Sequence, residues 1–126
     1  MILDKTTEID IQKVAESKIS QIDFSNLSFG NVFTDHMLEC DYKDGKWQAI
    51  KIRPYGPISL DPSAKVFHYG QAIFEGMKAY KDEKEQIWMF RPDENQKRLN
   101  KSAVRLAMPE FPENLFFDGI ETLLNI

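Results

Sequence analysis

The sequence predicts an α+β fold, a small domain with a mainly antiparallel sheet and flanking helices. Three observations support this prediction: a hairpin signal at Asp44-Gly45, a second hairpin pattern around residues 82–85, and two helical patterns near the C-terminal end. The 126 residues suit one small domain. Apolar residues make up 42% and charged residues 29%, as in ordinary folded proteins.

The first 28 residues are predicted to form an N-terminal arm, and residues 29–126 to form the domain itself. Apolar residues of the arm follow an imperfect helical spacing, at Ile9, Ile11, Val14, Ala15 and Ile19. This pattern hints at a helical stripe lying on another part of the protein.

The first hairpin is predicted from β-forming residues at 32–42 and 47–52, on either side of Asp44-Gly45. Glycine accepts the positive φ that a two-residue turn requires, so this dipeptide favours a tight reversal. We expect Trp47, Ala49 and either Ile50 or Ile52 to face the core.

The next segment is rich in turns. Proline-containing turns are expected on both sides of a short strand at 58–60. A compact helix is then predicted over residues 70–75, with Gly76 able to supply a left-handed cap after it.

A second hairpin and two helices complete the pattern. The runs 77–81 and 86–90 flank a charged turn and predict the hairpin. Pro92, at a plausible first helical position, opens a helix predicted over 92–107. Another helix is predicted over 113–126, and its apolar period continues to the last residue. The sequence therefore looks like a piece of a longer protein.

Composition argues against several classes of protein. Sixteen basic and 20 acidic residues give a net charge of −4, which disfavours nucleic-acid and anionic-membrane surfaces. The single cysteine, Cys40, excludes an internal disulfide and is expected to be a small core residue. No membrane-spanning run or signal peptide is recognisable, so a cytoplasmic location is expected. His36 and His68 lack metal-site spacing, and no metal site is predicted.

Four residues have two interpretations each. From the residues alone, Arg98 is an exposed helix residue with Glu94 as its partner four positions earlier. From the residues alone, three aromatic residues near the ends of predicted elements are expected to belong to the core: Phe29, Tyr69 and Phe74.

Three stretches together resemble a known family. They are Phe-Gly-Asn-Val-Phe-Thr-Asp-His-Met-Leu at 29–38, His-Tyr-Gly-Gln-Ala-Ile-Phe-Glu-Gly-Met-Lys-Ala-Tyr at 68–80, and Phe-Arg-Pro at 90–92 continuing to Leu106. In this order and spacing they resemble the N-terminal small domain of branched-chain amino acid aminotransferases, over about residues 28 to 126.

The resemblance implies a D-amino-acid-aminotransferase-like fold and pyridoxal 5'-phosphate as cofactor of the complete enzyme, a cofactor that the chain alone is not expected to bind. It assigns Arg98 to the cofactor phosphate, and Phe29, Tyr69 and Phe74 to the walls around the substrate side chain. Such a guanidinium suits a phosphate dianion, and three aromatic walls suit Leu, Ile or Val. The family exchanges their amino group with 2-oxoglutarate and works as a homodimer. No catalytic residue is assigned in this chain, because the family's cofactor-bonding lysine lies in a large C-terminal domain.

Alternatives remain at this point. Relatives with the same fold include D-amino acid aminotransferases and aminodeoxychorismate lyases, and the isolated chain could be a non-catalytic structural or interaction module. If Arg98 serves the cofactor, we expect it to point toward Tyr69 and Phe74 and to lack a full set of protein partners.

Overall fold

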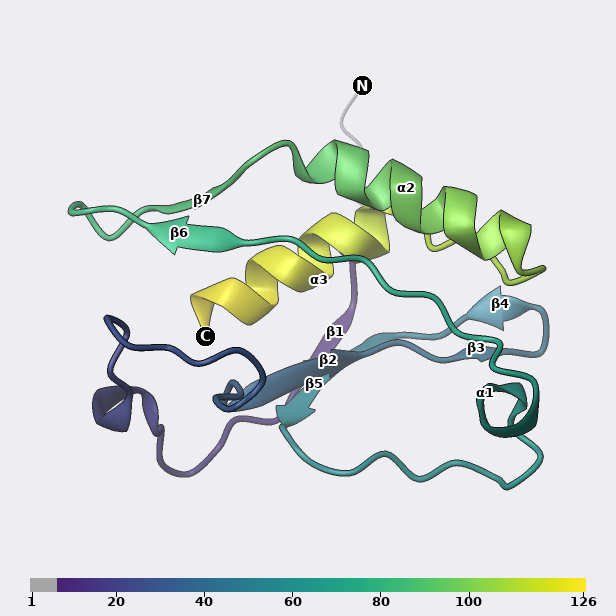
Figure 1. Cartoon of the computed structure of the whole chain (residues 1–126), viewed down its shortest axis with the longest axis horizontal. Coiled ribbons are helices and arrows are strands. Elements are labelled where there is room, and N and C mark those ends of the chain that lie inside the picture. The colour runs from purple at the N-terminus through teal and green to yellow at the C-terminus, as the bar shows by residue number, and fades with distance from the viewer. Residues whose placement is uncertain (1–6) are drawn as a thin grey trace. The chain divides into compact units, whose positions relative to one another are not determined.

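The computed structural model describes residues 7–126, so the prediction for residues 1–6 of the arm lies outside the described part. The chain divides into two compact units (Figure 1). Of the described residues, 7–58 and 118–126 form the sheet unit, and 59–117 form the helix unit. No helix of the described part is long and apolar enough to cross a membrane.

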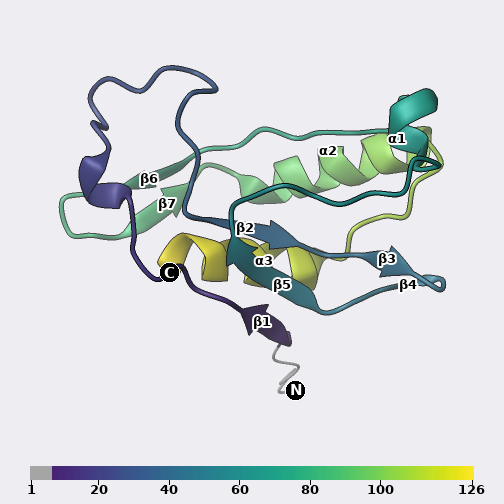
Figure 2. The same ribbon diagram turned by 90° about the horizontal axis from the view of Figure 1, so that it is seen from below.

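The sheet unit is built on a mixed three-stranded sheet. Its strands are β1 (Ile9–Ile11), β5 (Ile50–Pro54) and β2 (His36–Glu39), with β5 in the middle (Figure 2). β2 runs antiparallel to β5, whereas β1 runs parallel to it. The α+β class is thus confirmed, although the sheet is mixed rather than simply antiparallel.

The helical stripe predicted for the N-terminal arm is wrong. Ile9 and Ile11 lie in β1, opposite Ile50 and Ile52 of β5, and the described arm contains only one short helical turn, η1 (Ile19–Gln21). An edge of β5 offers backbone hydrogen-bonding partners, and this tertiary pairing outweighs a weak local period.

The first hairpin is confirmed. Its tip consists of β3 (Tyr42–Lys43) and β4 (Lys46–Trp47), and Asp44 and Gly45 both have positive φ, 54° and 77°. Tyr42 pairs with Trp47, and their rings meet edge to face with centroids 5.1 Å apart.

The core of the sheet unit centres on β5. Both Ile50 and Ile52 are fully buried, because β5 is the central strand, whereas Ala49 is exposed and the prediction for it is wrong. The later part of α3 (Glu113–Asn125) packs here: a Cβ added at Gly119 would lie 2.6 Å from Leu38 Cδ1. Glycine therefore permits a close approach of helix to sheet.

Two titratable residues of the sheet unit have protein partners. His36 is buried, and its Nε2 accepts a hydrogen bond from the Val14 backbone N–H at 3.0 Å. The half-buried Cys40 donates its S–H to the Gln48 carbonyl at 3.3 Å, and burial raises the pKa of its thiol.

The second hairpin and both helices near the C-terminal end form as predicted, although α3 lies only partly in the helix unit. The hairpin is formed by β6 (Ala79–Lys81) and β7 (Ile87–Met89), and α2 (Pro92–Arg105) follows it. Pro92 is the first residue of α2, a position that needs no N–H donor. The first turn of α3 also belongs to this unit.

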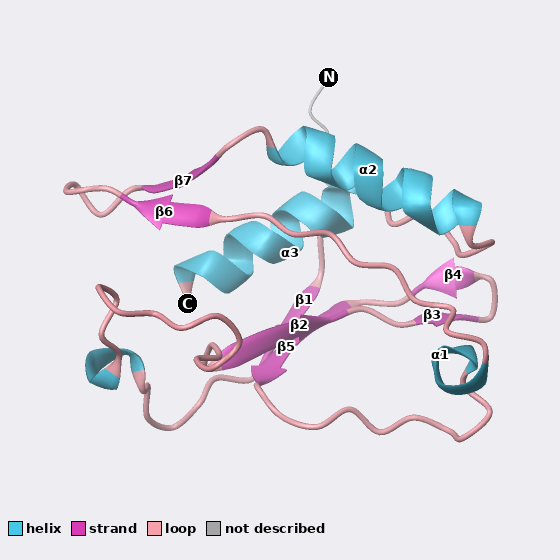
Figure 3. Ribbon diagram, in the orientation of Figure 1, coloured by secondary structure: helices cyan, strands magenta, loops and turns pink. Residues whose placement is uncertain are grey.

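Two predictions between residues 55 and 78 are wrong. Residues 58–60 form no strand, and residues 70–75 form no helix; both segments are drawn as loop in Figure 3. The only helix in this part is the short α1 (Lys65–His68). Gly70 has a φ of +61°, so this glycine lies just past the end of α1 instead of opening a helix.

Residues 71–76, which we name the strap, are extended. Residues of the strap alternate between half-buried and exposed, with Gln71, Ile73 and Glu75 half-buried and Ala72, Phe74 and Gly76 exposed. This period of two is typical of extended backbone, not of a helix.

The connection from α2 to α3 is fixed by side-chain amides. Asn100 Nδ2 donates to the Phe111 carbonyl at 3.0 Å, and the Phe111 N–H donates to Asn100 Oδ1 at 2.7 Å. Gln96, itself buried, also donates to the Phe111 carbonyl at 3.0 Å. These bonds satisfy the backbone N–H and carbonyl of Phe111, a residue that lies outside the helices and strands.

Candidate functional site

The strap is tied to α2 at both of its ends. Gln71 Nε2 donates to the Leu106 carbonyl at 2.8 Å, just past the end of α2. Near the start of α2, Asn95 Nδ2 donates to Glu75 Oε1 at 2.9 Å and to the Gly76 carbonyl at 3.0 Å. The strap therefore runs along α2 with both ends held.

An ion pair completes the tie near the start of α2. Arg98 Nε donates to Glu75 Oε2 at 2.7 Å, and Arg98 Nη2 donates to Glu75 Oε1. The Glu75 side chain is only 8% exposed, whereas that of Arg98 is 67% exposed. Two parallel bonds of this kind fix the plane of a guanidinium.

The electrostatics follow from this geometry. Hydrogen bonds from Arg98 and then Asn95 lower the pKa of Glu75 from its ordinary 4.5 to about 2, although desolvation acts in the opposite direction. The carboxylate in turn raises the pKa of Arg98. Both groups are charged at neutral pH.

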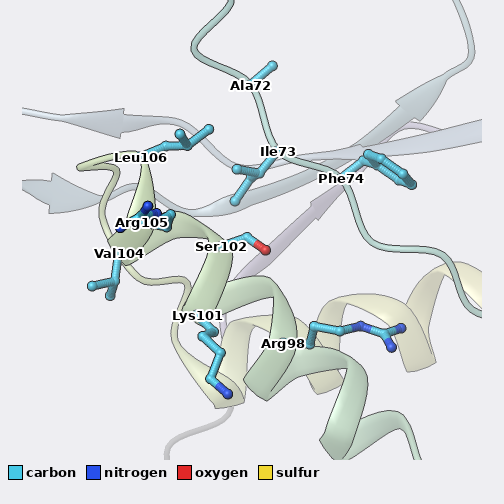
Figure 4. Close-up of a pocket in the computed structure, with 9 residues that line it drawn as sticks. All are labelled: Ala72, Ile73, Phe74, Arg98, Lys101, Ser102, Val104, Arg105 and Leu106. Atoms are coloured by element: carbon cyan, nitrogen blue, oxygen red, sulfur yellow. The ribbon is translucent and has the colours of Figure 1, made fainter.

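A groove of about 640 Å³ lies between the strap and α2 (Figure 4). The strap and α2 both contribute its lining residues, Ala72, Ile73, Phe74, Arg98, Lys101, Ser102, Val104, Arg105 and Leu106. Figure 4 shows Ile73 directed toward α2 and Arg98 extending from that helix.

The groove combines positive charge with apolar surface. Arg98, Lys101 and Arg105 follow one another at spacings of three and four on α2, and no described acidic residue lines the groove. Ile73 and Phe74 add apolar surface from the strap. Such a lining suits an anionic group attached to an apolar or flat body.

The predicted site residues are only partly brought together. Arg98 and Phe74 line the same groove. Tyr69, 83% exposed, follows α1 in the helix unit and does not line that groove, and Phe29 is fully exposed in the sheet unit. The interpretation of these three aromatics as core residues is wrong, since Phe74 is 91% exposed.

The expectation that Glu94 is the partner of Arg98 is wrong. Glu94 pairs with Lys97 at 2.9 Å and with Arg91 at 3.8 Å instead of with Arg98. Arg98 has a carboxylate partner in the buried Glu75 side chain of the strap, but no described residue accepts a hydrogen bond from its Nη1, so its set of protein partners is incomplete, as expected.

The sequence did not predict the residues that fix the strap to α2, above all Glu75, Asn95 and Gln71. One signal was available: Asn95, Arg98, Ser102 and Arg105 recur at spacings of three and four, so they share one face of α2. A polar face of this kind on a helix beside an aromatic segment could have indicated a lined groove. In the described part of the chain, no group of three or more His, Cys, Asp or Glu side chains is placed to hold a metal ion.

Comparisons with known proteins give one consistent result, although no family model matches the chain. The chain is 48% identical over 105 residues to branched-chain-amino-acid transaminase 1 of Bacillus subtilis, covering 82% of the chain and 30% of that protein. It is 44% identical over 125 residues to a probable branched-chain-amino-acid aminotransferase of Staphylococcus aureus, covering 98% of the chain and 34% of that protein. It is 50% identical over 103 residues to a branched-chain-amino-acid aminotransferase of Mycolicibacterium smegmatis, covering 81% of the chain and 28% of that protein. The chain thus spans about a third of the length of these curated relatives.

Proposed function

Because the chain is homologous to the N-terminal part of branched-chain amino acid aminotransferases, we propose that it forms the phosphate-binding side of such an enzyme's active site. The proposed reaction transfers the amino group between Leu, Ile or Val and 2-oxoglutarate. The observation that carries this proposal is the groove in which Arg98 and Phe74 meet.

The groove fits the charged end of pyridoxal 5'-phosphate. Glu75 uses Arg98 Nε and one bond of Nη2, so Nη1 and the second N–H of Nη2 are left to donate to a phosphate. Lys101 and Arg105 add positive charge, and Ile73 and Phe74 offer apolar surface to a flat ring. When bound, this cofactor supplies an electron-withdrawing ring that labilises bonds at the substrate's α carbon.

Within this chain we assign binding roles only. Arg98 binds the cofactor phosphate, and Phe74 packs against the aliphatic side chain of the substrate, with Tyr69 as a further wall; for Phe29 the same role rests on the resemblance alone. An aliphatic substrate side chain gains free energy from leaving water on such surfaces. The residue that bonds covalently to the cofactor is proposed to lie outside this chain, so we expect the chain alone to be inactive. We also propose that the complete enzyme is a cytoplasmic homo-oligomer and that residues 29–126 act as its small domain.

The test is a transaminase assay on the complete gene product that contains this sequence, with the 126-residue chain assayed in parallel. Leucine, isoleucine and valine serve as amino donors, 2-oxoglutarate as acceptor, and glutamate formation is measured. We expect activity with all three donors in the complete protein and none in the chain alone. Activity with D-alanine and none with leucine would instead indicate a D-amino acid aminotransferase.

A matched pair of variants tests the assignment of Arg98. Arg98→Ala should weaken the affinity for pyridoxal phosphate about tenfold or more, the scale of a lost charged hydrogen bond. Arg91→Ala removes the same charge at the start of α2, from a residue outside the groove, and should leave the affinity unchanged. Equal affinities for both variants would return Arg98 to the role of a surface residue.

A further inference from the structure

We propose that Glu75 is a positioning residue, whose buried carboxylate holds the Arg98 guanidinium so that its remaining N–H donors are presented to an anion in the groove. The inference rests on the proposed function only for the identity of that anion, the phosphate of the cofactor.

The hydrogen bonds divide the guanidinium into two parts. The Nε and Nη2 edge faces Glu75 through two bonds, and no described residue accepts a hydrogen bond from Nη1. A free arginine side chain has many rotamers, and the entropy lost in ordering it weakens ligand binding unless the side chain is already ordered. Because Arg98 is 67% exposed, packing alone does not order it.

Glu75 is suited to this role because it is itself immobilised. Its side chain is 8% exposed and accepts a third hydrogen bond, from Asn95 Nδ2 at 2.9 Å. Asn95 also holds the backbone of the strap through the Gly76 carbonyl. The carboxylate therefore has a fixed place relative to α2 and remains ionised at neutral pH, as its lowered pKa indicates.

A competing effect has the opposite sign. A carboxylate near an anion site repels the anion, so removal of the Glu75 charge would strengthen binding if electrostatic competition dominated. Removal would weaken binding if orientation dominated. The variant Glu75→Gln separates the two effects, because its amide nitrogen cannot accept a hydrogen bond from Arg98.

The experiment uses the 126-residue chain and pyridoxine 5'-phosphate, which carries the phosphate but has no aldehyde to react with lysines. Binding is followed through the backbone amide NMR signals of the groove residues Ala72, Ile73 and Ser102, which every variant retains, and pyridoxine without phosphate serves as the ligand control. The resemblance predicts no cofactor binding by the chain alone, whereas the ordered Arg98 predicts that wild type binds this phosphate. We expect Glu75→Gln to bind about fivefold more weakly or worse, and Arg98→Ala to lose binding.

The control variant is Glu94→Gln, which removes one negative charge from α2 four residues before Arg98. Glu94 contacts Lys97 and Arg91, so this change should leave the affinity as in wild type. The NMR spectrum of each variant reports whether the fold is retained. Equal or tighter binding by Glu75→Gln, or no binding by wild type, would overturn the proposal.

The binding experiment on Glu75→Gln and the transaminase assay test the two proposals separately. A complete protein without transaminase activity, whose chain still binds pyridoxine phosphate in a Glu75-dependent way, would contradict the reaction and leave the positioning role. An active transaminase in which Glu75→Gln keeps wild-type affinity for pyridoxal phosphate would contradict only the positioning role.

Discussion

Each unit of this protein buries apolar side chains, Ile50 and Ile52 in the sheet unit and Ala103 and Phe116 in the helix unit, but the helix unit adds a series of polar contacts along the strap and α2. In the sheet unit, β5 places Ile50 and Ile52 in a small apolar core, with 0% and 1% of their surface exposed, and Gly119 lets α3 approach it closely. In the helix unit, the strap and the connection after α2 are fixed largely by side-chain amides and one carboxylate, those of Gln71, Glu75, Asn95, Gln96 and Asn100.

The difference bears on function. Apolar burial is non-directional and stabilises a unit, whereas hydrogen bonds hold particular atoms at particular distances. Both units leave large aromatic side chains exposed, Phe29 in the sheet unit and Tyr69, Phe74 and Phe90 in the helix unit. A surface that must meet a ligand or further protein cannot bury these groups internally, so polar contacts define its shape instead.

The largest expected effect tests the apolar core of the sheet unit. Ile50→Ala removes a fully buried side chain, and we expect the free energy of unfolding to fall by about 2–5 kcal/mol. Each unit contains one tryptophan, Trp47 in the sheet unit and Trp88 in the helix unit. Urea unfolding followed by Trp47 fluorescence in a Trp88→Phe background measures the loss.

The control for this prediction is Ile19→Ala, the same substitution at a residue that is 61% exposed in the same unit. It should change the free energy of unfolding by less than about 0.5 kcal/mol. Equal losses for both variants would show that the sheet unit does not depend on the burial around β5.

A smaller effect is expected from the polar contacts of the helix unit. Asn100→Ala removes both hydrogen bonds to the Phe111 backbone, and we expect a loss of about 1–2 kcal/mol, partly offset by the better helix propensity of alanine. Unfolding followed by Trp88 in a Trp47→Phe background measures it. Asn114→Ala, at an exposed position of α3 in the same unit, should be nearly neutral; a similar loss there would contradict the role of Asn100.

The elements that the sequence predicted correctly carry their signals locally. Asp44-Gly45 requires only its own positive φ values, and Pro92 with two following acids marks the start of α2 without reference to other elements. Family resemblance singled out Arg98 and Phe74, which line one groove.

The elements that were missed depend on distant partners. β1 exists because β5 offers it an edge, and the strap is extended because Asn95 and Leu106 of the α2 region hold Glu75, Gly76 and Gln71. The Glu75–Arg98 pair joins residues 23 positions apart, so no helical or strand period in the sequence reveals it. Such contacts become visible only once the chain has folded.

The smallest expected effect concerns the response to acid of one carboxylate in each unit. Arg98 and Asn95 lower the pKa of Glu75 to about 2, so its contribution to stability is complete above its ordinary value of 4.5 and is lost as the pH falls toward 2. In the sheet unit, the hydrogen bond from Arg53 at 2.5 Å likewise lowers the pKa of Glu39.

Carboxyl ¹³C chemical shifts followed against pH measure both groups in one sample. We expect Arg98→Ala to move the midpoint of Glu75 upward toward 4.5 and to leave Glu39 unchanged, because the bond from Arg98 is the largest cause of the shift. Arg53→Ala, the matched loss of an arginine in the sheet unit, should move the midpoint of Glu39 upward and leave that of Glu75 unchanged. The remaining bond from Asn95 should keep Glu75 somewhat below 4.5 even without Arg98, since an amide donor still favours the charged form. A midpoint near 4.5 in the wild-type chain would show that Glu75 does not hold Arg98 in solution, and the contrast between the units would then rest on the amide contacts alone.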